Sequence, residues 1–195
     1  PDGGKNAITA MLELLCALPL AQDEAAAAIR ALHRFFPYGD NEGKALGIAM
    51  EDEISGRLSL VLSMLNLNEG GFTACFDCRA SLCATQATTQ GHVEQLFAAQ
   101  GWECDGKFAE GHAVDGDSEF VRTLLRSYEA YTGKQGYCLS IGGGTYVHEI
   151  PGGVAFGPAE TGFENNCHGA NERASLKGLL QCAAIYADVI ANLCK

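Results

Sequence analysis

Three consecutive glycines followed by a hydroxyl side chain form the first stretch that could contact a ligand. A hydrophobic run over residues 137–141 leads into Gly142, Gly143 and Gly144, and Thr145 comes next. Glycine lets the backbone approach a ligand closely and adopts conformations that side chains forbid. The backbone N–H groups and the Thr145 hydroxyl can then bind an anionic group such as a carboxylate. A tight strand-to-helix turn explains the glycines equally well, whereas a phosphate loop is disfavoured because no Gly-Lys-Ser/Thr follows.

A histidine in a polar loop is the second candidate. His168 stands three residues before Asn171 and four before Glu172. Its imidazole is a candidate metal ligand or catalytic group, because histidine titrates near neutral pH and binds metals such as zinc when neutral. Glu172 is a candidate hydrogen-bond acceptor that orients this loop. A solvated histidine and a carboxylate in the first turn of a helix are the simpler alternatives.

Arg79 is the third candidate, and it lies between Cys78 and Ala80 in a segment typical of a strand. Its planar guanidinium presents a rigid fork of donors, which suits it to holding the carboxylate of a substrate. A solvated charge at the edge of a sheet is the alternative interpretation. Asp77, two residues earlier, is interpreted as structural rather than catalytic.

The nine cysteines indicate reduced thiols rather than a disulfide framework, because an odd number leaves one thiol over. Several stand in apolar contexts, where free cysteine behaves as a small buried hydrophobe. Cys75, Cys78 and Cys83 resemble a zinc or iron–sulfur run only superficially, since no second pair at ligand spacing follows. Reduced cysteines are typical of a cytoplasmic protein, which is the predicted location.

The composition is that of a globular protein. Hydrophobic residues make up 47% of the 195 residues, which is enough to bury a sizeable core. The net charge of −11 argues against a nucleic-acid partner, which would need a basic face. No apolar run approaches the roughly 20 residues of a membrane span, so no membrane partner is expected. Pro1 is not a natural start residue, so polypeptide upstream could have been removed.

The elements that must position the candidates follow from hydrophobic periodicity and turn signals. Asn68-Glu69-Gly70 is a hairpin signal between two alternating strands. With one strand added upstream, the order of elements becomes the split β-α-β, ferredoxin-like sandwich. In this part of the chain we expect helices over Lys5–Leu18, Asp23–Phe36 and Thr89–Gln100, and strands over Leu58–Leu67, Gly71–Ser81 and Trp102–Val114.

From Asp115 the composition changes, and Asp115-Gly116-Asp117 is the predicted hinge. Two further strands are too few for a doubly wound sheet of their own. We therefore expect the returning half of a catalytic domain whose other half precedes Pro1. The predicted elements are an amphipathic helix over Ser118–Thr132, short buried strands over Tyr137–Ile141 and Gly153–Gly157, and a helix over Leu176–Leu193.

In order and spacing, these segments resemble the C-terminal end of the dinuclear-zinc aminoacylase/carboxypeptidase-type metallopeptidases, and most closely their Xaa-His dipeptidase (carnosinase-like) branch. That family has a Gly-Gly-Gly-Thr-Tyr turn, a Gly-Val-Ala-Phe-Gly strand and a His-Xaa-Ala-Asn-Glu loop, found here at residues 142–146, 153–157 and 168–172. Asp2–Ala7 resembles the segment just after the histidine that begins the family's lid domain, and Asp77–Arg79 resembles the lid strand that carries a substrate-binding arginine.

The resemblance implies a role for each candidate. His168 would be the last protein ligand of one of two zinc ions, and Glu172 would support its loop. Arg79 would lean from the lid and clamp the carboxylate of the substrate, and the glycine turn with its threonine would bind the same end. Two departures stand out: Ala80-Ser81 replaces an aromatic-proline pair, which leaves the exit of that strand undefined, and His148 replaces a common arginine.

The resemblance implies an α+β fold class. Residues 1–114 would form a ferredoxin-like α/β-sandwich lid, an antiparallel sheet with helices on one face, without its first strand. Residues 115–195 would form a C-terminal α/β segment of a split catalytic domain. Many relatives dimerise through the sheet edge and helix of the lid, so a homodimer is a further expectation.

The predicted function of the full-length protein is zinc-dependent hydrolysis of unblocked dipeptides. The family's upstream histidine, bridging aspartate, glutamate base, glutamate ligand and further aspartate have no matching motifs here. The chain is therefore expected to be an inactive fragment that does not bind the two zinc ions by itself. An N-acyl-amino-acid deacylase or desuccinylase of the same family is one alternative, and a non-catalytic binding or dimerisation module is another.

Overall fold

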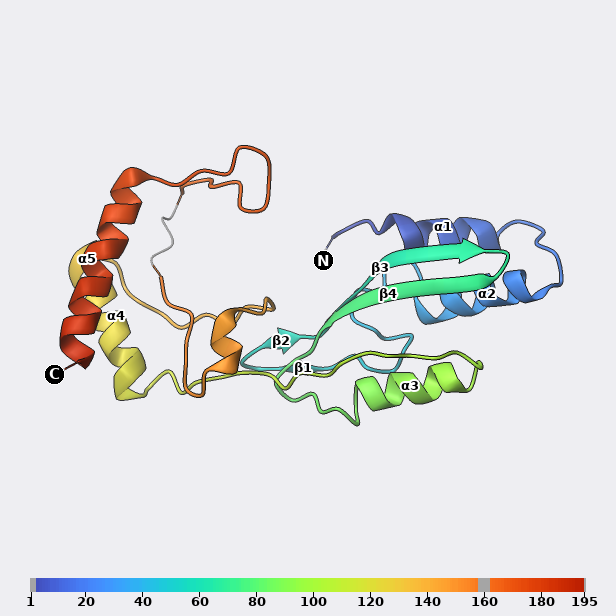
Figure 1. Ribbon diagram of the computed structural model, residues 1–195, viewed down its shortest axis with the longest axis horizontal. Helices are drawn as coiled ribbons and strands as arrows, with labels where there is room; N and C mark the ends of the chain where they lie inside the picture. Colours follow the sequence, from blue (N-terminus) through green and yellow to red (C-terminus); the bar gives the residue numbers. More distant parts are fainter. Residues whose placement is uncertain (1–2, 158–161, 195) are drawn as a thin grey trace. The chain divides into compact units, whose positions relative to one another are not determined.

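The computed structural model describes residues 3–157 and 162–194, and it combines helices with strands (Figure 1). These residues contain five α-helices and two small antiparallel sheets, in agreement with the α+β class. Unit 1 comprises the described residues up to His112 together with Ser140–Gly143. Unit 2 comprises Ala113–Leu139 and the described residues from Gly144 onward. The division into domains at 1–114 and 115–195 stays a prediction about the longer protein.

Unit 1 begins with two helices whose starts are fixed by side-chain caps. Helix α1 spans Ala7–Cys16 and helix α2 spans Glu24–Phe35, so both predicted helices are confirmed. The side chain of Asn6 accepts two backbone hydrogen bonds from the first turn of α1, and Asp23 caps α2 in the same way. Each cap pairs N–H groups that the first helical turn leaves without a partner.

A long antiparallel hairpin follows, as the sequence predicts. Strand β3 spans Ser59–Asn68 and strand β4 spans Gly71–Arg79, and they pair from Ser59 opposite Arg79 to Asn68 opposite Gly71. Helix α1 packs against both α2 and β3 (Figure 1). The side-chain amide of Asn6 donates to the backbone carbonyl of Leu62, 2.8 Å away, which ties the start of α1 to the hairpin.

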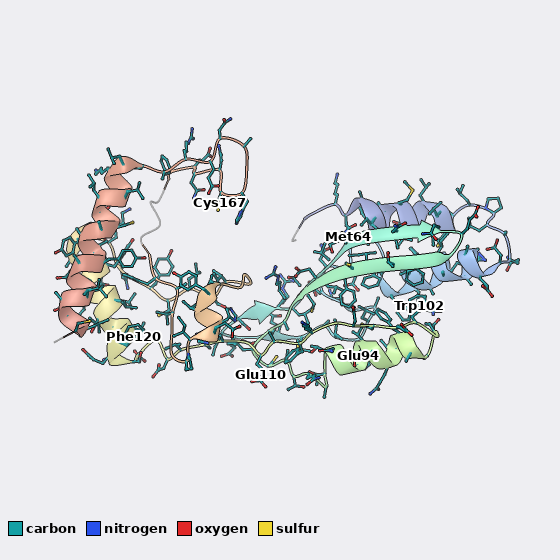
Figure 2. All side chains as sticks on the ribbon, viewed as in Figure 1. Met64, Glu94, Trp102, Glu110, Phe120 and Cys167 are labelled. Atoms are coloured by element: carbon teal, nitrogen blue, oxygen red, sulfur yellow. The ribbon has the colours of Figure 1, made fainter. Side chains whose placement is uncertain are left out.

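A bulge in β3 decides which side chains of the hairpin face the core. Leu62 lies opposite Phe76, but the next pair joins Met64 to Cys75, so one residue of β3 is extra. The bulge reverses the alternation. Met64 therefore lies on the exposed face, labelled in Figure 2, whereas Leu65 packs against the core. In β4 the even-numbered side chains face the core and the odd-numbered ones, including Arg79, are exposed.

An aromatic cluster forms the centre of the core of unit 1. The ring of Phe97, from helix α3 (Gln90–Ala98), lies 5.5–6.4 Å from the rings of Phe35, Phe36, Phe76 and Trp102. Edge-to-face and tilted contacts of this kind are favourable for aromatic rings. The cluster joins α2, α3 and β4 into one core, completed by buried aliphatic side chains that include Leu12, Leu32, Leu46, Ile48, Leu58, Leu60 and Leu62.

The strand predicted over Trp102–Val114 is wrong, because this segment joins no ladder. Trp102 and Cys104 nevertheless pack against the core, and Trp102 lies 4.8 Å from the ring of Phe72. The alternating pattern therefore reports side-chain burial rather than backbone pairing. A strand needs a partner for its N–H and C=O groups, and the hairpin supplies none to this segment.

Unit 2 is built on two packed helices, both confirmed. Helix α4 spans Glu119–Thr132 and ends at Gly133, whose φ of 67° is left-handed, and helix α5 spans Leu176–Leu193. Leu124, Ile185 and Val189 form the buried core between them. The hydroxyl of buried Ser127 on α4 donates to the carboxylate of Asp188 on α5 at 2.7 Å.

The two short buried strands predicted in this part of the chain are also wrong. Residues 137–141 and 153–157 belong to no sheet, and the side chains of Tyr137 and Leu139 are each 73% exposed. Val154 and Phe156 only pack beside the helix core. Both segments are apolar enough for a sheet interior, but no described strand forms a ladder with either of them.

Helix α5 is long and apolar enough to cross a membrane, by length and composition alone. This helix is not a continuous apolar run in the sequence, because Lys177 and Asp188 interrupt it. A core helix of a globular domain meets the same criteria, so the property alone is weak evidence for a membrane.

We expect Phe97→Ala to destabilise unit 1 by about 3–5 kcal/mol, because it removes the ring at the centre of the aromatic cluster. Chemical denaturation of the 195-residue chain, followed by Trp102 fluorescence, measures the change. Met64→Ala is the matched control, since its side chain is 61% exposed and should change stability by no more than about 0.5 kcal/mol. Equal effects of the two variants would contradict the assigned core.

Candidate functional site

Arg79 ends strand β4 on its exposed face and makes contacts with two neighbours. Its Nε lies 2.7 Å from Oδ1 of Asp77 and its Nη2 lies 3.2 Å from Oδ2 of the same carboxylate. Its Nη1 donates to the backbone carbonyl of Gly142 at 3.3 Å. Arg79 and Gly142 were both predicted to hold the carboxylate end of a substrate, and within unit 1 they are in contact.

The glycine turn needs no unusual backbone conformation. Gly142, Gly143 and Gly144 are not among the glycines with positive φ. A Cβ at Gly143 or Gly144 would meet nothing within 4 Å, and one at Gly142 would lie 3.8 Å from Cβ of Arg79. Neither strain nor crowding therefore accounts for glycine here. Close approach of a ligand remains as the predicted reason.

Thr145 follows the turn at the start of a short 3-10 helix, Tyr146–Glu149. Its Oγ1 is buried and has no hydrogen-bond partner among the residues that the structure describes. A buried hydroxyl without a partner costs about 1–3 kcal/mol, so a polar group supplied from outside these residues would stabilise it. Its predicted role in substrate binding stays a prediction.

Ser81 settles how the chain leaves β4, which the departure from the family's aromatic-proline pair had left open. Its side chain is buried, and the hydroxyl lies 2.8 Å from the carbonyl of Gly56 and 3.3 Å from that of Met50. Met50 directly precedes strand β1 (Glu51–Asp52), and Gly56 begins strand β2 (Gly56–Arg57). The two strands form a small hairpin that the sequence analysis missed. The residues just after Arg79 are thus anchored.

The carboxylate of Asp52 completes this anchor. It accepts hydrogen bonds from the hydroxyl and N–H of Ser55 and from the N–H groups of Ile54 and Cys83. These bonds, chiefly the one from the Ser55 hydroxyl, lower the pKa of Asp52 to about 2. The carboxylate is therefore charged at neutral pH and holds the loop after β4 to the β1–β2 hairpin.

His168 lies on an exposed loop that precedes α5, next to Cys167, labelled in Figure 2. The backbone there is unusual, because Asn166, His168 and Asn171 all have positive φ, at 54°, 62° and 58°. Left-handed conformations are uncommon for residues other than glycine, but asparagine and histidine are among the types that adopt them most often. The loop therefore turns sharply at three residues whose types suit that conformation.

Arg173 closes the base of this loop, and the sequence analysis missed it. Its N–H donates to the carbonyl of Asn165 and its Nε to that of Glu164, both at 2.9 Å. Its guanidinium also lies over the ring of Phe163, 5.8 Å from the ring centre. Both ends of the segment that carries His168 are joined by these contacts. The sequence feature that could have indicated this role is the position of Arg173, directly after the loop residue Glu172.

His168 and Glu172 are both exposed, and the predicted role of Glu172 in orienting this loop stays a prediction. No hydrogen bond joins them within the described loop, residues 162–173. Nowhere in residues 3–157 and 162–194 do three His, Cys, Asp or Glu side chains gather as a metal site requires. The chain's own described residues therefore do not fit a complete zinc site, although His168 is free to contribute one ligand.

The cysteines offer no alternative site. All nine lie within the described residues and are free. Burial, with a smaller contribution from the charge of Asp77, raises the pKa of the Cys78 thiol to about 11. Cys78 is therefore a protonated core residue at neutral pH, which suits neither a metal ligand nor a nucleophile.

We expect Arg173→Ala to loosen the His168 loop without unfolding unit 2, because it removes the bond to Glu164 and the contact with Phe163. A hydrogen bond of this kind contributes about 0.5–1.5 kcal/mol, so amide exchange over residues 165–171 should become about 2- to 10-fold faster. Hydrogen exchange read by mass spectrometry measures it. Arg122→Ala, which removes only a bond to exposed Asp117, is the control. Unchanged exchange in the loop would show that Arg173 does not shape it.

Comparison with known proteins relates the chain to dipeptidases, although no family model matches it. "Putative dipeptidase YtjP" of Bacillus subtilis is 36% identical over 80% of this chain, which is 34% of the length of that protein. "Beta-Ala-Xaa dipeptidase" of Lactobacillus delbrueckii is 34% identical over the whole chain, which is 41% of its length. "Putative dipeptidase SSP1012" of Staphylococcus saprophyticus is 26% identical over the same shares.

The chain thus spans between a third and about two fifths of the length of these curated relatives. Their names agree with one another, and the matches extend over both units. The similarities therefore support a dipeptidase family for this chain.

Proposed function

We propose that the chain is part of a longer dipeptidase that hydrolyses the peptide bond of unblocked dipeptides. The observation that carries this proposal is the similarity over the whole chain to a protein named as a Beta-Ala-Xaa dipeptidase. The chain corresponds to 41% of that relative, so the remaining catalytic groups would come from polypeptide outside these 195 residues. The chain by itself would be inactive, and the whole protein would be cytoplasmic.

Arg79 is proposed to hold the C-terminal carboxylate of the dipeptide. Its position supports this role, because it stands on the exposed face at the end of β4, with the next residues anchored by Ser81. Its contact with the carbonyl of Gly142 brings the glycine turn beside the guanidinium. The N–H groups of Gly142 and Gly143 would then bind the same carboxylate, and Gly143 leaves open space for it.

His168 is proposed to contribute one ligand to one of two zinc ions. The exposed imidazole and the sharp turns of its loop support this role. The other ligands and the glutamate that acts as general base would lie outside this chain. When bound, such ions would polarise the scissile carbonyl and lower the pKa of a water molecule. The part of His168 is to present a neutral imidazole from a loop that Arg173 closes.

The exposed apolar surface of unit 2 supports the idea that more polypeptide covers it. Four aliphatic side chains of α5, namely Leu176, Leu179, Leu180 and Ile190, are each more than half exposed. Large exposed apolar patches mark surfaces that another segment or partner covers. Unit 1 would likewise gain from an upstream strand, since β3 and β4 form a sheet of only two strands. Such a strand would give the ferredoxin-like lid, and its edge or helix would be the dimer contact.

Two alternatives give different results in one assay. A deacylase or desuccinylase of the same family would hydrolyse N-acyl amino acids and reject free dipeptides. A non-catalytic binding or dimerisation module would hydrolyse neither. The names of the relatives favour the dipeptidase. None of the described residues indicates whether the amine of the substrate is free or acylated.

We expect the longer protein to hydrolyse free dipeptides with zinc bound, and to leave N-acetylated amino acids intact. The 195-residue chain alone should be inactive, because the general base would be missing. Amino-acid release measures the activity, and metal analysis of the longer protein and its His168→Ala variant measures the zinc. Hydrolysis of N-acyl substrates alone would favour the deacylase, and absence of zinc would contradict the metal role of His168.

We expect Arg79→Ala in the longer protein to raise KM for dipeptides about 10- to 100-fold, because it removes charge-assisted hydrogen bonds to the substrate carboxylate. Steady-state kinetics with a dipeptide and its C-terminal amide measure the effect. The amide lacks the carboxylate, so its KM should not respond. Arg79→Lys keeps the positive charge but loses the planar set of N–H donors, so its KM for the dipeptide should lie between those of the unaltered protein and Arg79→Ala. Equal losses on both substrates would reject the carboxylate role.

A further inference from the structure

We propose that Asp77 is a positioning residue that aligns the guanidinium of Arg79 for a carboxylate ligand. This inference rests on the proposed function and extends it to a residue that the sequence analysis interpreted as merely structural. Asp77 touches no reacting atom in this proposal. It acts only through Arg79.

The geometry of β4 makes the pair. Residues two apart in a strand point to the same face, and Asp77 and Arg79 are both on the exposed face. Both carboxylate oxygens of Asp77 accept hydrogen bonds from Arg79. Oδ1 lies 2.7 Å from Nε and Oδ2 lies 3.2 Å from Nη2, so the carboxylate binds one side of the guanidinium. The residues opposite on β3 are Val61 and Ser59, which carry no charge that competes for either partner.

A count of donors shows what remains for a ligand. A guanidinium has five N–H donors. Asp77 accepts from two of them and the carbonyl of Gly142 from a third, which leaves two, one on Nη1 and one on Nη2. The side of the group that bears Nε is occupied by Asp77. The donors left over are one on each terminal nitrogen, and both can donate to a carboxylate.

Stability is a poor explanation of the pair. The side chains of Arg79 and Asp77 are 49% and 53% exposed, and ion pairs of such exposure stabilise folded proteins little. The pair does restrict a long side chain that would otherwise sample many rotamers. A guanidinium already held in place loses less conformational entropy when a ligand binds.

The sign of the effect separates positioning from simple electrostatics. The negative charge of Asp77 repels a carboxylate ligand, so Asp77→Asn should strengthen binding if charge alone mattered. If Asp77 positions Arg79, the same substitution should weaken binding despite the gain in positive charge. The two explanations therefore predict opposite changes.

The first test uses the longer protein and a free dipeptide. We expect Asp77→Asn to raise KM about 3- to 30-fold with little change in kcat, and to leave KM for the dipeptide amide unchanged. In an Arg79→Ala background Asp77→Asn should have no further effect. Asp77→Glu should restore part of the loss. A KM that falls or stays the same in Asp77→Asn, or an added loss in the Arg79→Ala background, would overturn the proposal.

Asp105→Asn is the matched control. Asp105 is an exposed aspartate of the same unit, and its substitution changes the net charge equally without touching Arg79. Its KM should equal that of the unaltered protein. Circular dichroism of all variants should overlay, because the ion pair contributes little to folding.

The second test does not depend on activity. In the 195-residue chain, the Nε–H of Arg79 should give an NMR signal that exchanges slowly with solvent and disappears in Arg79→Lys. Asp77→Asn should speed this exchange, and Asp105→Asn should not. No change in Asp77→Asn would refute the pair itself. A change here without dipeptide hydrolysis by the longer protein would instead refute the proposed function, and with it the ligand that Arg79 is aligned to hold.

Discussion

The antiparallel ladder between β3 and β4 is the interaction on which unit 1 depends. It turns one face of the hairpin toward α1, α2 and the aromatic cluster, and leaves the other face exposed. The bulge after Leu62 is what lets both Leu62 and Leu65 reach the core. The same ladder places Arg79 at the end of β4 with its side chain outward. The position of the predicted substrate arginine is therefore a consequence of how the hairpin buries Phe72 and Phe76.

The described residues of unit 2 form no corresponding ladder, and this explains their exposed apolar surface. Its buried core lies between α4 and α5 and is small, with Leu124, Ile185 and Val189 at the centre. The apolar segments around residues 137–141 and 153–157 have strand composition without strand partners. These segments and the apolar side chains of α5 are exposed for the same reason. Two helices alone have too little surface to bury all of these apolar groups. In the proposed longer protein, further polypeptide would cover these apolar groups.

Helices and the hairpin could be predicted from the sequence because their signals are local. Asn6, Asp23, Ser118 and Gly133 are caps that can be found by position, and Asn68-Glu69-Gly70 marks a turn. The three strands that were predicted wrongly would have needed neighbouring strands to pair with, and a local sequence pattern does not indicate whether such neighbours exist. At the candidate site, Arg79, Gly142 and His168 could be named by resemblance. The contacts of Asp77, Ser81 and Arg173 could not, since each depends on how the chain folds around a functional residue rather than on its type.

The contacts that Asp77, the carbonyl of Gly142 and Arg173 make have a property in common that bears on how such a site is built. Asp77 and the carbonyl of Gly142 hold Arg79 entirely within unit 1, and Arg173 holds the His168 loop entirely within unit 2. The side chain of Arg79 and the loop that carries His168 are thus each held by neighbours in their own unit. In the proposed dipeptidase, a substrate carboxylate would then bind an arginine that is already held in place, which lowers the entropy lost in forming the complex. In the proposed dipeptidase, the remaining requirement is the polypeptide that completes the metal site.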